Sequence, residues 1–237
     1  MRYGFLITSA LNTKFGVHTT EQRLQQTLDT ISTVKMHCPD AHITLVEMAG
    51  IPITPEQKKR FQDNVNLVVD FSGQEAVKEV FKSDNWDVVK NVTEVMCFGE
   101  LLKIIATHPS YNGIDRFFKL SGCYILNEGF DINTYDESVK DKIIVAKRRL
   151  SQFAPQITGG CQYQFMSRCW SFPANILPEI QEVYKNSLTF MMERLNNKGY
   201  VDIEHCLFKF LPLNKVVEKD TMGVQGLLGP NGILVKD

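Results

Sequence analysis

The sequence predicts one α/β domain built on a mostly parallel, mixed sheet with helices on both faces. The first 71 residues follow the order strand, helix, strand, helix, strand, which is typical of a parallel sheet whose connections are helical. The second half is less regular, so we expect the sheet to become mixed there. With 237 residues and 43% hydrophobic residues spread along the chain, one core is favoured over two.

Three short apolar runs mark the strands of the first half. They are GFLITSA at 4–10, HITLVEM at 42–48 and NLVVDF at 66–71. The first run lies close to the N-terminus, but polar residues from Thr8 onward close it too early for a signal peptide. We therefore interpret it as the first strand of the sheet.

Helical signals separate these strands. An apolar stripe with helical spacing over 23–34 predicts a long helix, which Pro39 ends. Residues 54–57, Thr-Pro-Glu-Gln, form a capping box with proline at the first helical position, so a second helix begins there. Two further helices are expected at 74–82 and 87–107, ahead of the central strand.

The second half carries a different set of elements. We expect strands at 115–121, 142–148 and 163–172, a long amphipathic helix at 178–196 and a short helix at 202–211. Strands without regular helical crossovers between them indicate the mixed half of the sheet.

The composition excludes several classes of protein. The net charge of −1 provides no excess of Lys and Arg, so no nucleic-acid partner is expected. No run approaches the ~18 apolar residues of a membrane span, which predicts no transmembrane segment. Six cysteines are scattered without a C-x-x-C pair or a zinc-ligand spacing, so we expect reduced thiols in an intracellular, cytoplasmic protein.

Common cofactor and nucleophile motifs are missing. The first strand is followed by neither G-x-G-x-x-G nor G-x-x-x-x-G-K-[ST], and G-x-S-x-G does not occur. Ligands of open α/β sheets bind at the carboxyl ends of the strands. The small or polar residues expected there are Thr8, Ser9, Asn12, Glu47, Asp70, Ser72, Ser121, Gly122 and Tyr124.

The central strand has an unusual break. RFFKL at 116–120 is followed by Ser121 and Gly122 before apolar residues resume. A serine and a glycine form a small, flexible ledge where a ligand can approach the backbone closely. A β-bulge without any ligand explains the same pattern equally well.

Five segments, taken in order, resemble GT-A-type glycosyltransferases, in particular the uncharacterised glycosyltransferase-like proteins of bacteria and large DNA viruses. The segments are FLITSAL, RLQQTLDTISTVKMHCPDAHITLVE, NVTEVMCFGELLKII, RFFKLSGCYIL and YVDIEHCLFKFL, and the likeness spans about residues 3–232. In those proteins a strand ends K-[LI]-[ST]-G-R-Y at the place where many GT-A enzymes carry an Asp-x-Asp metal motif.

The resemblance implies a glycosyltransferase domain over 1–237 that moves a hexose or pentose from a nucleotide-diphosphate sugar to a glycan acceptor, as in polysaccharide biosynthesis. It divides the chain into a nucleotide-sugar-binding half, 1–125, and an acceptor-binding half, 126–237. The glycine-rich stretch 223–232 would form a mobile C-terminal lid over the diphosphate. Glycine-rich chain ends are also often frayed.

We expect a set of residues to contact the donor, most of them because they lie at strand ends or carry positive charge, and Lys90, Asn91 and Glu94 because the resemblance turns their side of the helix toward the nucleotide. The full set is Thr8, Ser9, Ala10, Arg23, Glu47, Lys90, Asn91, Glu94, Lys119, Ser121, Gly122 and Tyr124. For Lys90, Asn91 and Glu94 the alternative is a solvated helix face with a Lys–Glu pair four residues apart. For Arg23 the alternative is an ordinary surface arginine.

Two departures from the family pattern concern the metal. No Asp-x-Asp stands within 115–131, where only Asp115 and Asp131 flank the strand end, and Cys123 replaces the family's arginine. A divalent metal, Mn or Mg, and a metal-independent enzyme therefore both stay open, and the metal ligands are unknown. The cations that could supply the charge of this missing arginine, a candidate phosphate-binding residue, are Lys119, Lys147, Arg148 and Arg168.

Asp202 and Glu204 open the last expected helix. In inverting GT-A enzymes a carboxylate at a comparable helix start acts as general base on the acceptor hydroxyl, so the resemblance assigns this role to Glu204 or Asp202. A helix N-terminus favours the ionised carboxylate. Acidic residues are also common at this position for capping alone.

Other interpretations stay open. One is a non-catalytic nucleotide- or carbohydrate-binding module with a degenerate GT-A fold that lacks the metal motif. Another is an α/β nucleotidyltransferase, which would need clustered carboxylates that the sequence does not provide. For Trp170, packing in the core is favoured over stacking on a sugar ring.

Overall fold

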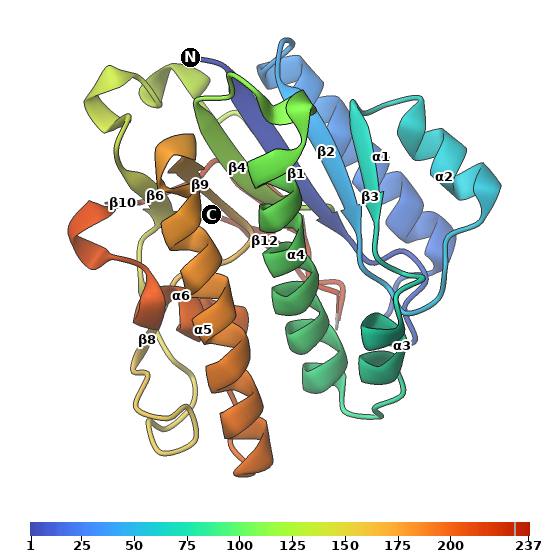
Figure 1. Ribbon diagram of the computed structural model, residues 1–237, viewed down its shortest axis with the longest axis vertical. Helices are drawn as coiled ribbons and strands as arrows, with labels where there is room; N and C mark the ends of the chain where they lie inside the picture. The colour runs from blue at the N-terminus through green and yellow to red at the C-terminus, as the bar shows by residue number, and fades with distance from the viewer. Residues whose placement is uncertain (230) are drawn as a thin grey trace.

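A seven-stranded sheet forms the centre of the structure, a computed structural model that describes residues 1–229 and 231–237 (Figure 1). Its strands, in spatial order, are β10 (Val216–Lys219), β6 (Ile143–Ala146), β9 (Cys169–Pro173), β4 (Arg116–Ser121), β1 (Tyr3–Ser9), β2 (His42–Glu47) and β3 (Leu67–Asp70). β9 runs antiparallel to both of its neighbours, and the other neighbouring pairs are parallel. The predicted mostly parallel, mixed sheet is confirmed.

Helices cover both faces of this sheet. They are α1 (Thr20–His37), α2 (Pro55–Gln62), α3 (Glu75–Phe81), α4 (Thr93–Thr107), α5 (Leu177–Asn196) and α6 (Ile203–Phe210). Side chains of α1 and α2 pack with Phe5 and Phe118, whereas those of α4, α5 and α6 pack with Leu6 and Phe117. In Figure 1, α4 and α5 lie side by side in front of the sheet and α1 lies behind it. Because successive strand side chains point to opposite faces, each face has its own core.

Shorter elements connect the main ones. One small sheet joins β12 (Leu234–Lys236), β11 (Val224–Leu227) and β5 (Tyr124–Leu126), and another joins β7 (Arg149–Leu150) and β8 (Tyr163–Gln164). Single 3-10 turns lie at Pro109–Tyr111, Ile132–Thr134, Glu137–Val139, Ala174–Ile176 and Leu213–Lys215. A π-helical turn, Val88–Val92, immediately precedes α4, so the helix predicted at 87–107 is present with a local change of winding.

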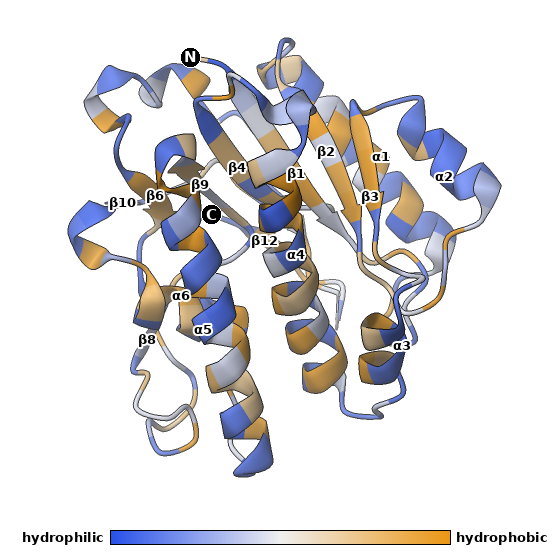
Figure 2. Cartoon of the chain, in the orientation of Figure 1, coloured by the Kyte–Doolittle hydropathy of each residue, from blue (hydrophilic) through white to orange (hydrophobic). Residues whose placement is uncertain are grey.

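Capping boxes begin two helices in the first half of the chain, and the one at Thr54 was predicted. Thr54 forms a capping box with Gln57 at the start of α2, and Thr19 forms a second one with Gln22 at the start of α1. Figure 2 shows hydrophobic residues along β2 and β3 and hydrophilic ones over much of α2. β2 is fully buried and β3 is half-buried at the edge of the sheet, whereas α2 turns most of its surface to water.

Two further predictions concern particular residue types. Trp170 has no exposed surface and packs in the core, as expected. All six cysteines are free thiols, also as expected. Within the described residues, no helix combines the length and the apolar character needed to cross a membrane.

The strand predicted at 163–172 is wrong in its continuity. β8 ends at Gln164 and β9 begins at Cys169. Between them, Phe165 N donates to the backbone oxygen of Glu204, and Ser167 O accepts from Lys119 Nζ. The backbone of this segment therefore bonds to α6 and to a side chain of β4 instead of continuing the ladder.

The loop predicted at 223–232 contains a strand, β11, over Val224–Leu227. β11 pairs antiparallel with both β5 and β12. A Cβ on Gly226 would lie 2.2 Å from Cys123 O, and one on Gly223 would lie 2.1 Å from Phe130 N. These glycines therefore permit close backbone contact between segments that are distant in sequence. Pro230, which the prediction included, lies outside the described residues.

The break at Ser121 and Gly122 lets the chain stay close to the end of β1 as it leaves β4, the parallel neighbour of β1. Gly122 N donates to Thr8 O at 2.8 Å, and Gly122 O accepts from Thr30 Oγ1 of α1 at 3.1 Å. A Cβ at Gly122 would lie 2.9 Å from Thr8 O. The backbone contact alone therefore requires glycine here, with or without a ligand.

We expect Gly122→Ala to lower the free energy of unfolding by about 1–3 kcal/mol, because the added methyl group forces the ends of β1 and β4 apart. Gly73→Ala is the matched control, since a Cβ there meets no atom within 4 Å. Replacing an unstrained glycine is neutral or slightly stabilising. Urea unfolding measures both variants, and equal midpoints for the two would contradict the close contact.

Candidate functional site

A cavity of about 540 Å³ opens at the carboxyl ends of β1 and β4, and both halves of the chain contribute to its wall. The predicted site residues that line it are Thr8, Ser9, Ala10, Arg23, Lys90, Glu94, Ser121, Gly122, Tyr124, Asp202 and Glu204. Leu228 and Gly229 also line it, so the predicted lid stretch reaches the cavity. Asn12, Asp70 and Ser72, also expected at strand ends, are not part of the wall.

Three predicted donor contacts, Glu47, Asn91 and Lys119, lie behind the wall. Glu47 is fully buried, and its Oε1 accepts from Leu11 N and Ala49 N, both at 3.0 Å. Burial raises the pKa of Glu47. This carboxyl group ties together the segments that follow β1 and β2, and Asn91 is likewise buried. These side chains support the wall and do not face the space where a donor would lie.

Lys119 has its three donors occupied by protein. Its Nζ lies 2.7 Å from Glu94 Oε1, 2.9 Å from Ser121 Oγ and 2.9 Å from Ser167 O. The side chain is fully buried. An ammonium group has three protons to donate, so none is left for a ligand. Lys119 was expected to contact the donor, but its ammonium group is bound by protein and supports the cavity wall.

The π-helical turn decides which residues of this helix face the cavity. Residues 87–107 were expected to form a regular helix with Lys90, Asn91 and Glu94 along one side. The wider turn leaves Lys90 and Glu94 on the cavity wall and buries Asn91. Such π turns often occur at functional sites. The alternative of a solvated face with a Lys90–Glu94 pair does not hold, because Glu94 pairs with Lys119.

Lys90 is a cation without a close counter-ion. Its side chain is solvent-exposed, yet it stands among the atoms of the cavity wall. Burial alone would lower the pKa of Lys90, but the charges of Glu204, Glu94 and Asp202 raise it above its ordinary value. In the described part of the chain, no carboxylate lies within ion-pair distance of its Nζ.

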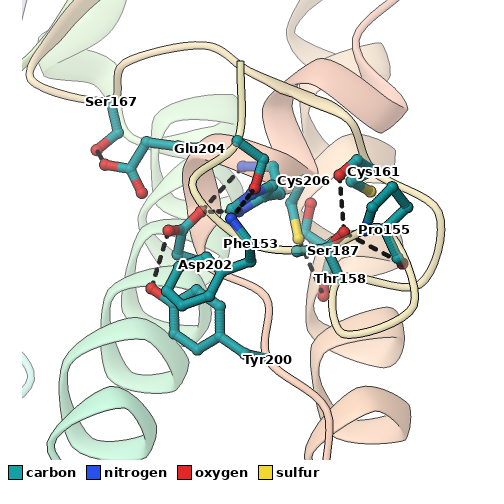
Figure 3. Close-up of polar contacts among 12 residues, drawn as sticks. Phe153, Pro155, Thr158, Cys161, Ser167, Ser187, Tyr200, Asp202, Glu204 and Cys206 are labelled. Carbon is teal, nitrogen blue, oxygen red and sulfur yellow. Dashed lines mark hydrogen bonds and ion pairs between the residues drawn. The ribbon is translucent and has the colours of Figure 1, made fainter. Parts of the chain in front are cut away.

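Asp202 is held by several hydrogen bonds. As the N-cap of α6, its Oδ1 accepts from His205 N at 3.0 Å and lies 2.6 Å from His205 Nδ1. Its Oδ2 accepts from Tyr200 Oη at 2.9 Å, a contact drawn in Figure 3. His205 Nε2 lies 2.8 Å from Ser151 Oγ. Burial would raise the pKa of Asp202, but the bonds to His205 lower it overall.

Glu204 is less constrained. Its Oε1 lies 2.5 Å from Ser167 Oγ, and the two residues are neighbours in Figure 3. Across residues 1–229 and 231–237, its second carboxylate oxygen has no hydrogen-bond partner. Burial, reinforced by the charge of Asp202, raises the pKa of Glu204. At the start of α6, both carboxylate oxygens of Asp202 therefore accept hydrogen bonds, whereas in the described chain one oxygen of Glu204 accepts none.

Aromatic side chains form a part of the cavity wall that the sequence analysis missed. Phe15 and Trp86 meet edge to face with their ring centroids 5.5 Å apart, and Phe81 lies on the same wall. Phe153 and Tyr200 pack at 4.4 Å between centroids. These residues come from separate segments and show no shared spacing. Only the fold brings them together.

Comparison with known proteins identifies the fold. No protein-family model and no curated protein matches the chain. Its structure is similar to core-mannan synthase A of Aspergillus fumigatus in the Mn/GDP form (TM-score 0.51, 10% identity, 95% of this chain and 74% of that one). It is also similar to the galactosyltransferase LgtC with donor and acceptor sugar analogues (TM-score 0.55, 12% identity, 91% and 72%). An active-site mutant of LgtC gives a TM-score of 0.54. The chain has the fold of GT-A glycosyltransferases.

The GT-A fold makes a metal site at the end of β4 the natural expectation, but the residues there do not fit one. Ser121, Gly122 and Cys123 offer no carboxylate. Asp115 accepts from Arg2 N, and Asp131 accepts from its near neighbour Asn133. Throughout the described residues, no group of three or more His, Cys, Asp or Glu side chains is arranged to hold a metal. Mn and Mg prefer oxygen ligands, carboxylates above all.

We expect Glu204→Gln to be more stable than the natural protein at pH 8, with the difference shrinking toward zero near pH 4. The folded state raises the pKa of Glu204, so it holds this proton more tightly than the unfolded chain does. The natural protein therefore loses stability as pH rises above about 4.3, the ordinary pKa of Glu. Gln cannot ionise, and its amide oxygen still accepts from Ser167.

Asp202→Asn is the contrasting variant. The lowered pKa of Asp202 means that its ionised form stabilises the fold above the unfolded pKa of about 3.9, and that this contribution is lost as pH falls through the folded value. The Asp202→Asn substitution should therefore be destabilising at neutral pH. Thermal unfolding between pH 4 and pH 8 tests both variants. If the Glu204→Gln protein unfolds at a lower temperature than the natural protein at pH 8, the ionised Glu204 carboxylate stabilises the fold, and the raised pKa assigned to it is wrong.

Proposed function

We propose that this protein transfers a sugar from a nucleotide-diphosphate sugar to a hydroxyl group of a glycan acceptor. The observation that carries the proposal is the Glu204 carboxylate, which presents an unpaired oxygen on the wall of a cavity at the carboxyl ends of β1 and β4 in a GT-A fold. An acceptor hydroxyl needs a carboxylate within hydrogen-bond reach that can take its proton. Glu204 meets the chemical requirement better than Asp202.

The donor would lie along the wall contributed by residues 1–125. Thr8 and Ser9 end β1 there and Ala10 follows them, beside Ser121 and Gly122. The aromatic residues Phe15, Phe81 and Trp86 supply flat apolar surface, and bases stack favourably on such rings. The acceptor would enter from the side of residues 126–237, where Phe153 and Tyr200 stand near the start of α6.

The reaction follows from this placement. The acceptor oxygen attacks the anomeric carbon, the new glycosidic bond forms, and the bond to the diphosphate breaks. Glu204 receives the hydroxyl proton, and the nucleoside diphosphate leaves with the bonding electrons. Its raised pKa makes Glu204 a stronger base than an ordinary carboxylate while it is ionised. Asp202 orders the helix start through its bonds to His205 and Tyr200.

A second candidate is a non-catalytic nucleotide- or carbohydrate-binding module. The absence of carboxylates at the end of β4, where the family's metal motif would stand, favours this alternative. Such a module would bind a nucleotide or a glycan without turnover. The two functions therefore differ in whether a nucleoside diphosphate is released when donor and acceptor are both present.

We expect Glu204→Gln to reduce kcat by about 10²- to 10⁴-fold while the donor dissociation constant changes little, because only proton transfer is lost. Asp202→Asn keeps a side chain that caps the helix as well as Asp does, so it should lose stability only through the lost charge interaction with His205 and should keep more activity. The assay measures nucleoside diphosphate release from a panel of nucleotide sugars with glycan acceptors, alongside calorimetric donor binding.

The outcomes separate the alternatives. Folded Glu204→Gln protein with undiminished turnover would place the base elsewhere or indicate a retaining mechanism, which needs no such base. Donor binding without turnover across the panel by the natural protein would support the binding module.

A further inference from the structure

Positive charge gathers around Cys123, at the turn where the family's metal motif would stand. Burial raises the pKa of the Cys123 thiol, and the charges of Lys119, Arg23 and Lys90 oppose that rise. Three cations from three different elements, β4, α1 and the π turn, therefore act on one point of the cavity wall. Lys119 is neutralised there by Glu94, at 2.7 Å.

Arg23 keeps its charge available. Its guanidinium donates to Phe15 O through Nη2 at 3.3 Å, and its buried Nε has no hydrogen-bond partner. Within 1–229 and 231–237, no carboxylate lies within ion-pair distance of it. Gly16 leaves room for the side chain, since a Cβ there would lie 2.6 Å from Nη2. A half-buried guanidinium with an unsatisfied donor on a cavity wall is suited to an anionic ligand.

The other cations considered from sequence are already paired. Lys147 meets Asp220 at 3.5 Å, Arg168 meets Asp237 at 3.1 Å, and Arg148 pairs with Glu218. Among the cations that line the cavity, Arg23 and Lys90 are thus the two without a carboxylate partner in the described chain.

We infer that Arg23 and Lys90 bind the diphosphate of the donor in place of a divalent metal, so that donor binding is metal-independent. The inference rests on the proposed function for the identity of the ligand as a nucleoside diphosphate. Two cations on the cavity wall supply the same charge as one divalent ion, and charge-assisted hydrogen bonds to phosphate oxygens supply the directionality. Lys90 also stands near Glu204, which places the phosphate-binding charge beside the proposed base.

The test is calorimetric titration with UDP, GDP and ADP in EDTA and then in the presence of Mn. We expect at least one of these nucleotides to bind in EDTA, with a dissociation constant that Mn leaves essentially unchanged. Lys90→Met and Arg23→Met should each weaken that binding by about 10- to 100-fold, the usual effect of losing a hydrogen bond to a charged group. Lys147→Met is the matched control and should bind as the natural protein does.

Each result decides the inference. It is overturned if the nucleotides bind only with Mn, if none binds under either condition, or if both variants bind as tightly as the natural protein. The proposed function fails separately: binding in EDTA without sugar transfer to any acceptor leaves the diphosphate site standing and removes the transferase. Sugar transfer that requires Mn would overturn the metal-independent diphosphate site and leave the proposed transferase standing.

Discussion

The ammonium group of Lys119 lies where three parts of the structure meet. Lys119 belongs to β4 at the centre of the sheet, and its Nζ contacts Glu94 of α4, Ser121 at the end of its own strand and Ser167 between β8 and β9. The group is fully buried, so each of these contacts replaces a hydrogen bond that the ammonium group would make to water in the unfolded chain. Removing one partner of a buried pair leaves an uncompensated charge, at a typical cost of about 3–5 kcal/mol. The cavity wall depends on this one charge being satisfied.

The same contact reaches the candidate base. Ser167 accepts from Lys119 through its carbonyl and contacts Glu204 through its hydroxyl, so the orientation of Glu204 is coupled to the centre of the sheet. The two carboxylates at the start of α6 then differ in environment. Asp202 is stabilised as an ion by His205 and Tyr200, whereas Glu204 is destabilised as an ion by burial and by Asp202. Two acidic groups two residues apart thus acquire a structural and a chemical role.

Elements with strong local signals could be predicted from the sequence. The capping box at Thr54 and the strand expected at 42–48 are examples, since both are decided by residues close together in the chain. β5 and β11 could not be predicted, because Tyr124–Leu126 pairs with residues about a hundred positions away. The glycines of 223–232 were interpreted as freedom of the backbone. Their contacts with Cys123 and Phe130 show that they allow close packing.

The sequence by itself determined the alternation of strands and helices, and hence that Thr8, Ser121 and Gly122 lie at the carboxyl ends of strands. It also determined that the end of β4 carries no carboxylates for a metal. Only the tertiary structure decided which charges remain free: Lys119 is consumed by Glu94 and Ser167, while Arg23 and Lys90 find no carboxylate in the described chain. The physical reason is that a charge is available to a ligand only when no partner from a distant segment satisfies it, and such partners are set by packing and not by local spacing.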